Sequence, residues 1–100
     1  MLRVRYKGAV AMKLYLDDLR KAPKGWIPVR NYRDAIHLLQ NFEISEISLD
    51  HDLGDLEPPG IAVVNWIEEQ VFKYDFEPPK MVVHSMNPVG RDNMLAAIAS

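Results

Sequence analysis

The sequence contains no cysteine and no long apolar run, and its charges are nearly balanced. Without cysteine there is no disulfide framework, no thiolate metal site and no cysteine nucleophile, which suits the cytoplasm. No apolar stretch approaches the roughly 18 residues that a membrane span needs. A formal net charge of -2 gives duplex nucleic acid no overall attraction. We therefore expect a cytoplasmic protein that acts on neither a membrane nor duplex nucleic acid.

The composition is that of one folded domain. The chain has 100 residues, 48% of them hydrophobic and 26% charged, which suffices for a single packed core. Residues 1–11 have two interpretations. LRVRYK alternates apolar and cationic residues, as a strand does. Alternatively, Met12 begins the native domain and residues 1–11 are an N-terminal extension, which we favour because the strand that follows needs nothing before it. The domain is then expected over residues 12–100.

Proline- and glycine-rich turns divide the chain, and between them the hydrophobic period changes. Apolar runs predict strands at 14–16, 26–29, 46–49 and 80–84, and helical spacing predicts helices at 32–42, at 60–74 and from residue 88. Pro28 places the second strand at a sheet edge, because proline cannot donate to the ladder. The last strand is a continuous apolar run, typical of a strand buried on both faces.

N-cap candidates and stripes of apolar residues are further evidence for the predicted helices. Asn31 is a candidate N-cap, and Asn87 with Pro88 suits an N-cap followed by the first helical position. The residues expected to be buried are Val63, Val64, Ile67, Val71 and Tyr74 in the helix at 60–74, and Met94, Leu95 and Ile98 in the last helix. The order β-β-α-β-α-β-α predicts an α/β fold with a central, mostly parallel four-stranded sheet.

Acidic, histidine or serine side chains, which can bind a metal or handle a proton, stand at the ends of three of the four predicted strands. In parallel sheets the carboxyl ends of the strands share one edge, where ligands bind at a switch in strand order. Residues far apart in sequence should therefore meet there. These residues are Asp17 and Asp18 after the first strand, Asp50, His51 and Asp52 after the third, and His84 at the end of the fourth with Ser85 after it.

The carboxylates of Asp17, Asp18 and Asp50 suit Mg²⁺ or Mn²⁺, because oxygen ligands and repelling like charges favour a bound cation. The alternative is that the aspartate pair simply caps a turn. His51 and His84 are candidates for proton transfer as general acid or base, or for binding a transition metal, against the alternative of a structural hydrogen bond. His37 belongs to the surface or to helix packing.

A phosphate could be held beside these groups. Arg20, Arg91 and the N-terminus of the last helix offer guanidinium and free N–H donors. The alternative for the arginines is a solvated salt bridge to Asp52, Asp55 or Glu57. Ser85 could contact a phosphate oxygen, and we prefer this to a nucleophilic role because no GxSxG elbow surrounds it.

Together, LDDLR, SLDHDLGD and VHSMNPVGR resemble the cyclic-phosphate-processing receivers, relatives of response-regulator receiver domains. The resemblance covers nearly all of residues 12–100 and implies a three-layer receiver-like (flavodoxin-like) fold, reduced relative to ordinary receivers. Asp17 and Asp18 resemble the pair that binds Mg²⁺, Asp50 the aspartate that accepts a phosphoryl group, and Ser85 the hydroxyl residue after the fourth strand. No helix fits between the first two strands, and without a fifth strand the lysine of ordinary receivers has no candidate.

Other polar residues take the place of that lysine, namely His51, Asp52, His84, Asn87 and Arg91. They suit an enzyme pocket, in which Asn87 joins the phosphate-binding residues and Asp52 contacts a ligand residue rather than the ion. We therefore expect a metal-dependent phosphoesterase acting on a cyclic-phosphate or related nucleotide. The alternatives are a non-catalytic module that binds a phosphorylated ligand or is phosphorylated on Asp50, and a scaffold with an inert acidic rim. The sequence indicates no oligomeric state.

Overall fold

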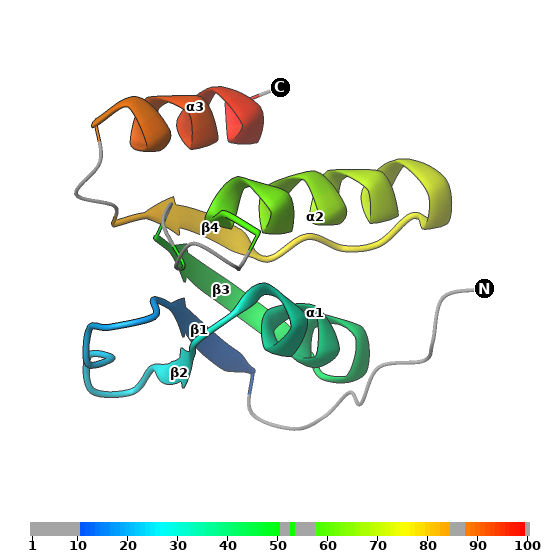
Figure 1. The fold of residues 1–100 in the computed structure, drawn as a ribbon. Coiled ribbons are helices and arrows are strands. Elements are labelled where there is room, and N and C mark those ends of the chain that lie inside the picture. Colours follow the sequence, from blue (N-terminus) through cyan, green and yellow to red (C-terminus); the bar gives the residue numbers. More distant parts are fainter. Residues whose placement is uncertain (1–10, 51–52, 54–57, 85–87, 100) are drawn as a thin grey trace.

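The structure, a computed structural model, describes residues 11–50, 53, 58–84 and 88–99. The described residues form seven elements in the predicted order (Figure 1), and their bounds lie within two residues of the predicted ones. They are β1 (Met12–Leu16), β2 (Ile27–Val29), α1 (Tyr32–Asn41), β3 (Ile44–Leu49), α2 (Gly60–Tyr74), β4 (Lys80–Val83) and α3 (Pro88–Ala99). None of the described helices is long and apolar enough to cross a membrane.

The four strands form one sheet in the order β2-β1-β3-β4, and every neighbouring pair is parallel. The expected edge position of β2 is confirmed. The polar ends of β1, β3 and β4 therefore meet at one edge of the sheet, as predicted. Parallel strands joined through helices confirm the α/β class and the reduced receiver-like fold.

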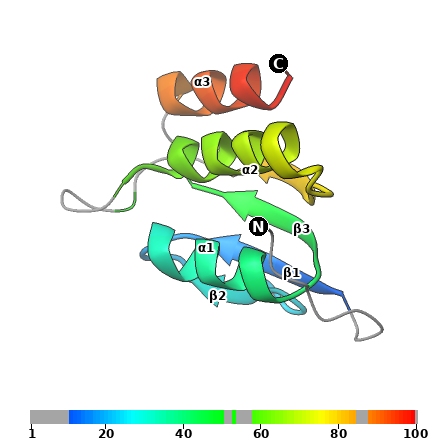
Figure 2. The same ribbon diagram turned by 90° about the vertical axis from the view of Figure 1, so that its right-hand side faces the viewer.

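The described helices form one layer. The connections from β2 to β3 and from β3 to β4 step across the sheet in the same direction, so right-handed crossovers place α1 and α2 on the same face. The third helix packs against α2 and β4, and both views show the helices in the order α1, α2, α3 (Figures 1 and 2). Within the described ranges, the layer that is reduced relative to a full receiver is thus the opposite one.

On that opposite face, aromatic rings take part of the space that a helix would fill. Tyr15 packs edge-on against Trp26, with ring centroids 6.3 Å apart. The ammonium group of Lys13 lies 5.4 Å from the centroid of the Trp26 ring. These contacts matter for the site, because Tyr15 lies directly before the end of β1.

The core lies between the sheet and the helices. Alternate strand residues point into it, and register pairs Leu14 with Ile47 and Leu16 with Leu49. The helices contribute Ala35, Leu39, Val63, Val64, Ile67 and Met94, all fully buried. The predicted N-cap of α1 is confirmed, since Asn31 Oδ1 accepts a 2.9 Å hydrogen bond from the backbone N–H of Asp34.

Three residues of the predicted apolar stripes are exposed instead of buried: Val71 by 38%, Tyr74 by 45% and Leu95 by 47%. The prediction that β4 is buried on both faces is also wrong, because Met81, Val82 and Val83 are only partly buried. Both errors have one cause. In the described sheet β4 is the outer strand, so residues on the far flank of α2 and α3 have no strand beneath them.

Candidate metal centre

Two carboxylates and an imidazole meet at the carboxyl edge of the sheet. Asp17, Asp50 and His84 each offer one ligand atom, and these atoms lie within 4.8 Å of one another. Asp17 is buried, and the other two residues are partly exposed. The cluster therefore has one buried member, Asp17, and is accessible to solvent through Asp50 and His84.

The sheet itself fixes the three backbones, because each residue continues its ladder by one hydrogen bond. The backbone N–H of Asp17 donates to Val29 O, that of Asp50 to Leu16 O and that of His84 to Leu49 O, each at 3.0 Å. The convergence predicted from the strand ends is therefore a direct consequence of parallel pairing.

Asp17 is the most constrained member. The residue is 1% exposed, and Oδ1 accepts hydrogen bonds from the backbone N–H of Leu19 at 2.9 Å and of Arg20 at 2.7 Å. Oδ2 lies 3.0 Å from Nε2 of His84. Burial raises the pKa of Asp17, but the two backbone hydrogen bonds and the His84 ring outweigh it, so the pKa lies below its ordinary value of 3.8. The carboxylate is thus charged at neutral pH.

The imidazole of His84 is held on three sides. Nε2 faces Asp17, while Nδ1 lies 2.7 Å from Oγ of Ser48. The ring also stacks on Tyr15, with centroids 4.1 Å apart and planes 9° from parallel. Both nitrogens and one face of the ring are engaged, which leaves His84 little freedom to turn.

Two arginines lie at the same edge. Arg30 follows β2, and its Nη1 donates to Asp17 O at 3.0 Å and to Arg20 O at 2.7 Å, which ties down the turn after β1. Nη1 of Arg20 donates to His84 O at 3.4 Å, so this guanidinium lies beside the cluster. Arg91 is exposed at the start of α3, with Nε 3.9 Å from Oδ1 of Asp92.

The predicted site residues therefore divide into three sets, apart from Arg91, whose contact is the one with Asp92. Asp17, Asp50 and His84 come together, and Arg20 lies beside them. Asp18 is partly exposed at the start of the turn and is not a member of the ligand group formed by the described residues. The roles predicted for His51, Asp52, Ser85 and Asn87 fall outside the described residues and stay predictions.

Sequence reasoning missed Tyr15, Ser48 and Arg30. Tyr15 and Ser48 face each other across β1 and β3, and each precedes a cluster aspartate by two positions. Because side chains alternate along a strand, two positions is the spacing at which residues share a face. Arg30 could have been found by the rule already applied to the other strands, since it directly follows β2.

One glycine lets α2 begin against the site. A Cβ atom on Gly60 would overlap the carbonyl oxygen of Asp50 and lie 3.2 Å from Sδ of Met94. The helix can approach Asp50 this closely only because the first helical residue has no side chain.

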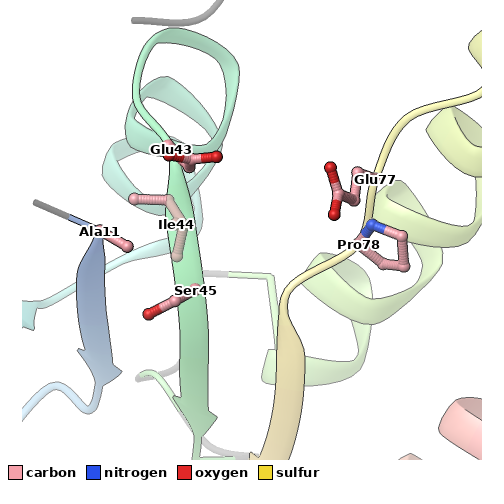
Figure 3. A pocket seen from close by; sticks show the side chains of 6 residues that line it. All are labelled: Ala11, Glu43, Ile44, Ser45, Glu77 and Pro78. Carbon is pink, nitrogen blue, oxygen red and sulfur yellow. The ribbon is translucent and has the colours of Figure 1, made fainter. Parts of the chain in front are cut away.

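A polar hollow lies at the opposite edge of the sheet. Figure 3 shows its walls, with Glu43 and Glu77 on opposite sides. Its volume is about 350 Å³, and it is lined by Ala11, Glu43, Ile44, Ser45, Glu77 and Pro78. These residues precede or begin the strands, so this hollow is separate from the cluster at the strands' carboxyl ends.

A parallel sheet with acidic and histidine side chains gathered at its carboxyl edge defines a receiver-like α/β domain. Residues 12–100 match the family model of the cyclic-phosphate processing receiver domain. The chain belongs to this family, which confirms the resemblance carried by the three motifs. No match was found among the curated proteins or among the solved structures.

Proposed function

We propose that this domain is a divalent-metal-dependent phosphoesterase that acts on a cyclic-phosphate or related nucleotide. The observation that carries the proposal is the convergence of Asp17, Asp50 and His84 at the sheet edge where such folds bind ligands. The family's association with cyclic-phosphate processing supports the substrate class.

The donor set fits a divalent ion. Atoms bound to one ion at about 2.1 Å stand at most about 4.2 Å apart, and the three candidate atoms already lie within 4.8 Å of one another. Two carboxylates with an imidazole favour Mn²⁺, since Mg²⁺ prefers oxygen ligands alone. An all-oxygen site would instead require Asp18 to replace His84, which is the three-carboxylate set predicted from the sequence.

A bound divalent ion would polarise a phosphoryl oxygen and lower the pKa of a water molecule. The chain supplies the surroundings. Asp17 is held by two backbone hydrogen bonds, and the guanidinium of Arg20 lies beside His84, where it can bind a phosphate oxygen.

Hydrolysis adds the oxygen of water to phosphorus and breaks one ester bond of the ring, and the leaving oxygen takes up a proton. A nitrogen that binds the ion cannot also carry that proton. If His84 is a ligand through Nε2, proton transfer therefore falls to His51, the second predicted acid or base.

The test is turnover of cyclic mononucleotides, 2′,3′-cyclic phosphates and cyclic oligonucleotides with Mn²⁺ or Mg²⁺. We expect a phosphomonoester product that depends on the metal and disappears in Asp50→Asn. Glu69→Gln is the control, because Glu69 is a half-exposed carboxylate on α2 that pairs with Lys73. Absence of product with every substrate class, at protein well above trace levels, would count against the proposal.

The metal preference separates the two ligand sets. With His84 as a ligand, His84→Gln should abolish Mn²⁺ binding in calorimetry while Asp18→Asn retains it. With three carboxylates the order reverses, and Mg²⁺ should bind as well as Mn²⁺ does.

Phosphorylation of Asp50 is the second candidate, because Asp50 follows the inner strand β3, is partly exposed and lies within the acidic cluster. Acetyl phosphate should then produce a mass gain that Asp50→Ala loses, and beryllofluoride should raise the melting temperature. An inert acidic rim predicts no thermal shift with metal or nucleotide, since only a ligand bound to the folded state stabilises it.

A further inference from the structure

Ser48 is one of only two buried polar residues in the described part of the chain, the other being Asp17. It lies within β3 between Ile47 and Leu49, which are both fully buried. Its side chain points to the face of the sheet that none of the described helices covers, in a row with Tyr15 on β1 and Val82 on β4.

The side chain of His84 extends from the end of β4 over β3, and it passes β3 at Ser48. His84 follows β4, yet it stacks on Tyr15 of β1 and contacts Asp17 after β1, and β3 lies between these strands. A small side chain at position 48 leaves room for this crossing. The hydroxyl oxygen of Ser48 lies 2.7 Å from Nδ1 of His84.

The two partners of His84 differ in what they can accept or donate. The charged carboxylate of Asp17 only accepts, so without a metal Nε2 must carry the hydrogen and donate to it. In a neutral ring, Nδ1 then carries no hydrogen, and its lone pair accepts from the hydroxyl of Ser48. A nitrogen that binds a metal must instead offer its lone pair, which moves the hydrogen of a neutral ring to Nδ1.

We propose that Ser48 is a positioning residue that holds the His84 ring in one orientation while its tautomer changes. Its hydroxyl donates to Nδ1 in the metal-free site and, after rotation about its C–O bond, accepts from Nδ1–H when Nε2 binds the ion. A serine or threonine hydroxyl can fill both roles, whereas a methyl group fills neither. The metal-bound half of this inference rests on the proposed function, and the metal-free half does not.

The matched variants are Ser48→Thr and Ser48→Val, which have the same shape and differ in the hydroxyl. Ser48→Ala, which only removes an atom, covers the case in which a branched side chain does not fit. Zinc is the probe, because it is diamagnetic and binds imidazole nitrogen. Side-chain ¹⁵N spectra at about pH 8, where free imidazole is neutral, report the tautomer. The signals of His84 are assigned with His84→Gln.

We expect the Nε2–H tautomer in the metal-free wild type and the Nδ1–H tautomer with zinc. Calorimetry should show zinc binding weakened about 10- to 100-fold in Ser48→Val and Ser48→Ala, the usual effect of losing a partner of a ligand histidine, with Ser48→Thr close to the wild type. Equal zinc affinity in Ser48→Thr and Ser48→Val, both folded, would overturn the proposal, as would an Nδ1–H tautomer without metal.

The two proposals fail differently. A wild type that binds no zinc, Mn²⁺ or Mg²⁺ contradicts the metal centre and the accepting role of Ser48. The donating role is then decided by the metal-free spectra alone: the ¹⁵N shift of Nδ1 should change in Ser48→Val and Ser48→Ala, which lose the hydroxyl that donates to it, and should stay unchanged in Ser48→Thr.

Discussion

The imidazole of His84 lies flat against the phenol ring of Tyr15, at a centroid distance of 4.1 Å and an interplanar angle of 9°. The two residues belong to strands that are not neighbours, since β3 separates β1 from β4. The stack therefore fixes the position of a strand-end side chain from two strands away. It also provides part of the cover that a helix would give to the face on which the described part of the chain places no helix.

Tyr15→Leu should remove the ring on which His84 stacks and leave the His84 side chain freer to move. A stacked aromatic pair contributes about 0.5–1.5 kcal/mol beyond burial, so we expect the free energy of unfolding to fall by at least that amount and Mn²⁺ affinity to fall with it. Urea denaturation and calorimetry measure the two effects. Tyr15→Phe, which keeps the ring, is the control. If both variants bind Mn²⁺ equally well, the stack does not position His84.

The depressed pKa of Asp17 predicts a specific acid sensitivity. A carboxyl group whose pKa is lower in the folded than in the unfolded protein adds stability above the unfolded pKa of about 4, and this stability is lost as the pH falls through the folded pKa. Asp17→Asn should therefore flatten the decline of unfolding free energy below about pH 5. Urea denaturation of metal-free protein at several pH values measures the slope, and equal slopes in both proteins would contradict the assignment.

The sequence predicted the parallel sheet and the meeting of Asp17, Asp50 and His84 because both follow from chain order. Strand–helix–strand connections dictate parallel pairing, and parallel pairing brings the carboxyl ends together. Exposure of Val71, Tyr74 and Leu95 could not be predicted in the same way. Helical spacing shows which residues share a face, but how far that face extends over the sheet depends on where the last strand lies.

The partners of His84 were missed for a related reason. Ser48 lies in an uninterrupted run with Ile47 and Leu49, so local hydrophobicity did not show which face its side chain takes. Only the register of β3 against β1 and β4 places it beneath the His84 ring. The contacts that hold the His84 ring depend on the register of three strands together. Each acidic residue, by contrast, can be predicted from the end of a single strand.

Arg30→Gln should release the turn after β1. Its guanidinium donates to the carbonyl oxygens of Asp17 and Arg20, the first bond partly buried and the second exposed, and each is worth on the order of 1 kcal/mol. We expect faster hydrogen exchange at the backbone amides of Leu19 and Arg20, which donate to the Asp17 carboxylate. Arg33→Gln, at an exposed position on α1, is the control. Unchanged exchange at both amides would show that the turn holds without Arg30.

Two glycine substitutions separate crowding at the site from backbone strain away from it. In Gly60→Ala the added methyl group meets the carbonyl oxygen of Asp50, so α2 or Asp50 must move. In Gly25→Ala nothing lies within 4 Å of the new atom, but a φ of 88° strains any residue with a side chain. The second change should cost about 1–2 kcal/mol of unfolding free energy.

Both glycine variants should therefore be less stable than the wild type, and only Gly60→Ala should also weaken Mn²⁺ binding. Urea denaturation gives the first quantity and calorimetry on the folded variants gives the second. Equal Mn²⁺ affinity in the two would mean that Asp50 keeps its place when α2 is pushed back. The close start of α2 would then serve packing against Met94 and not the ligand cluster.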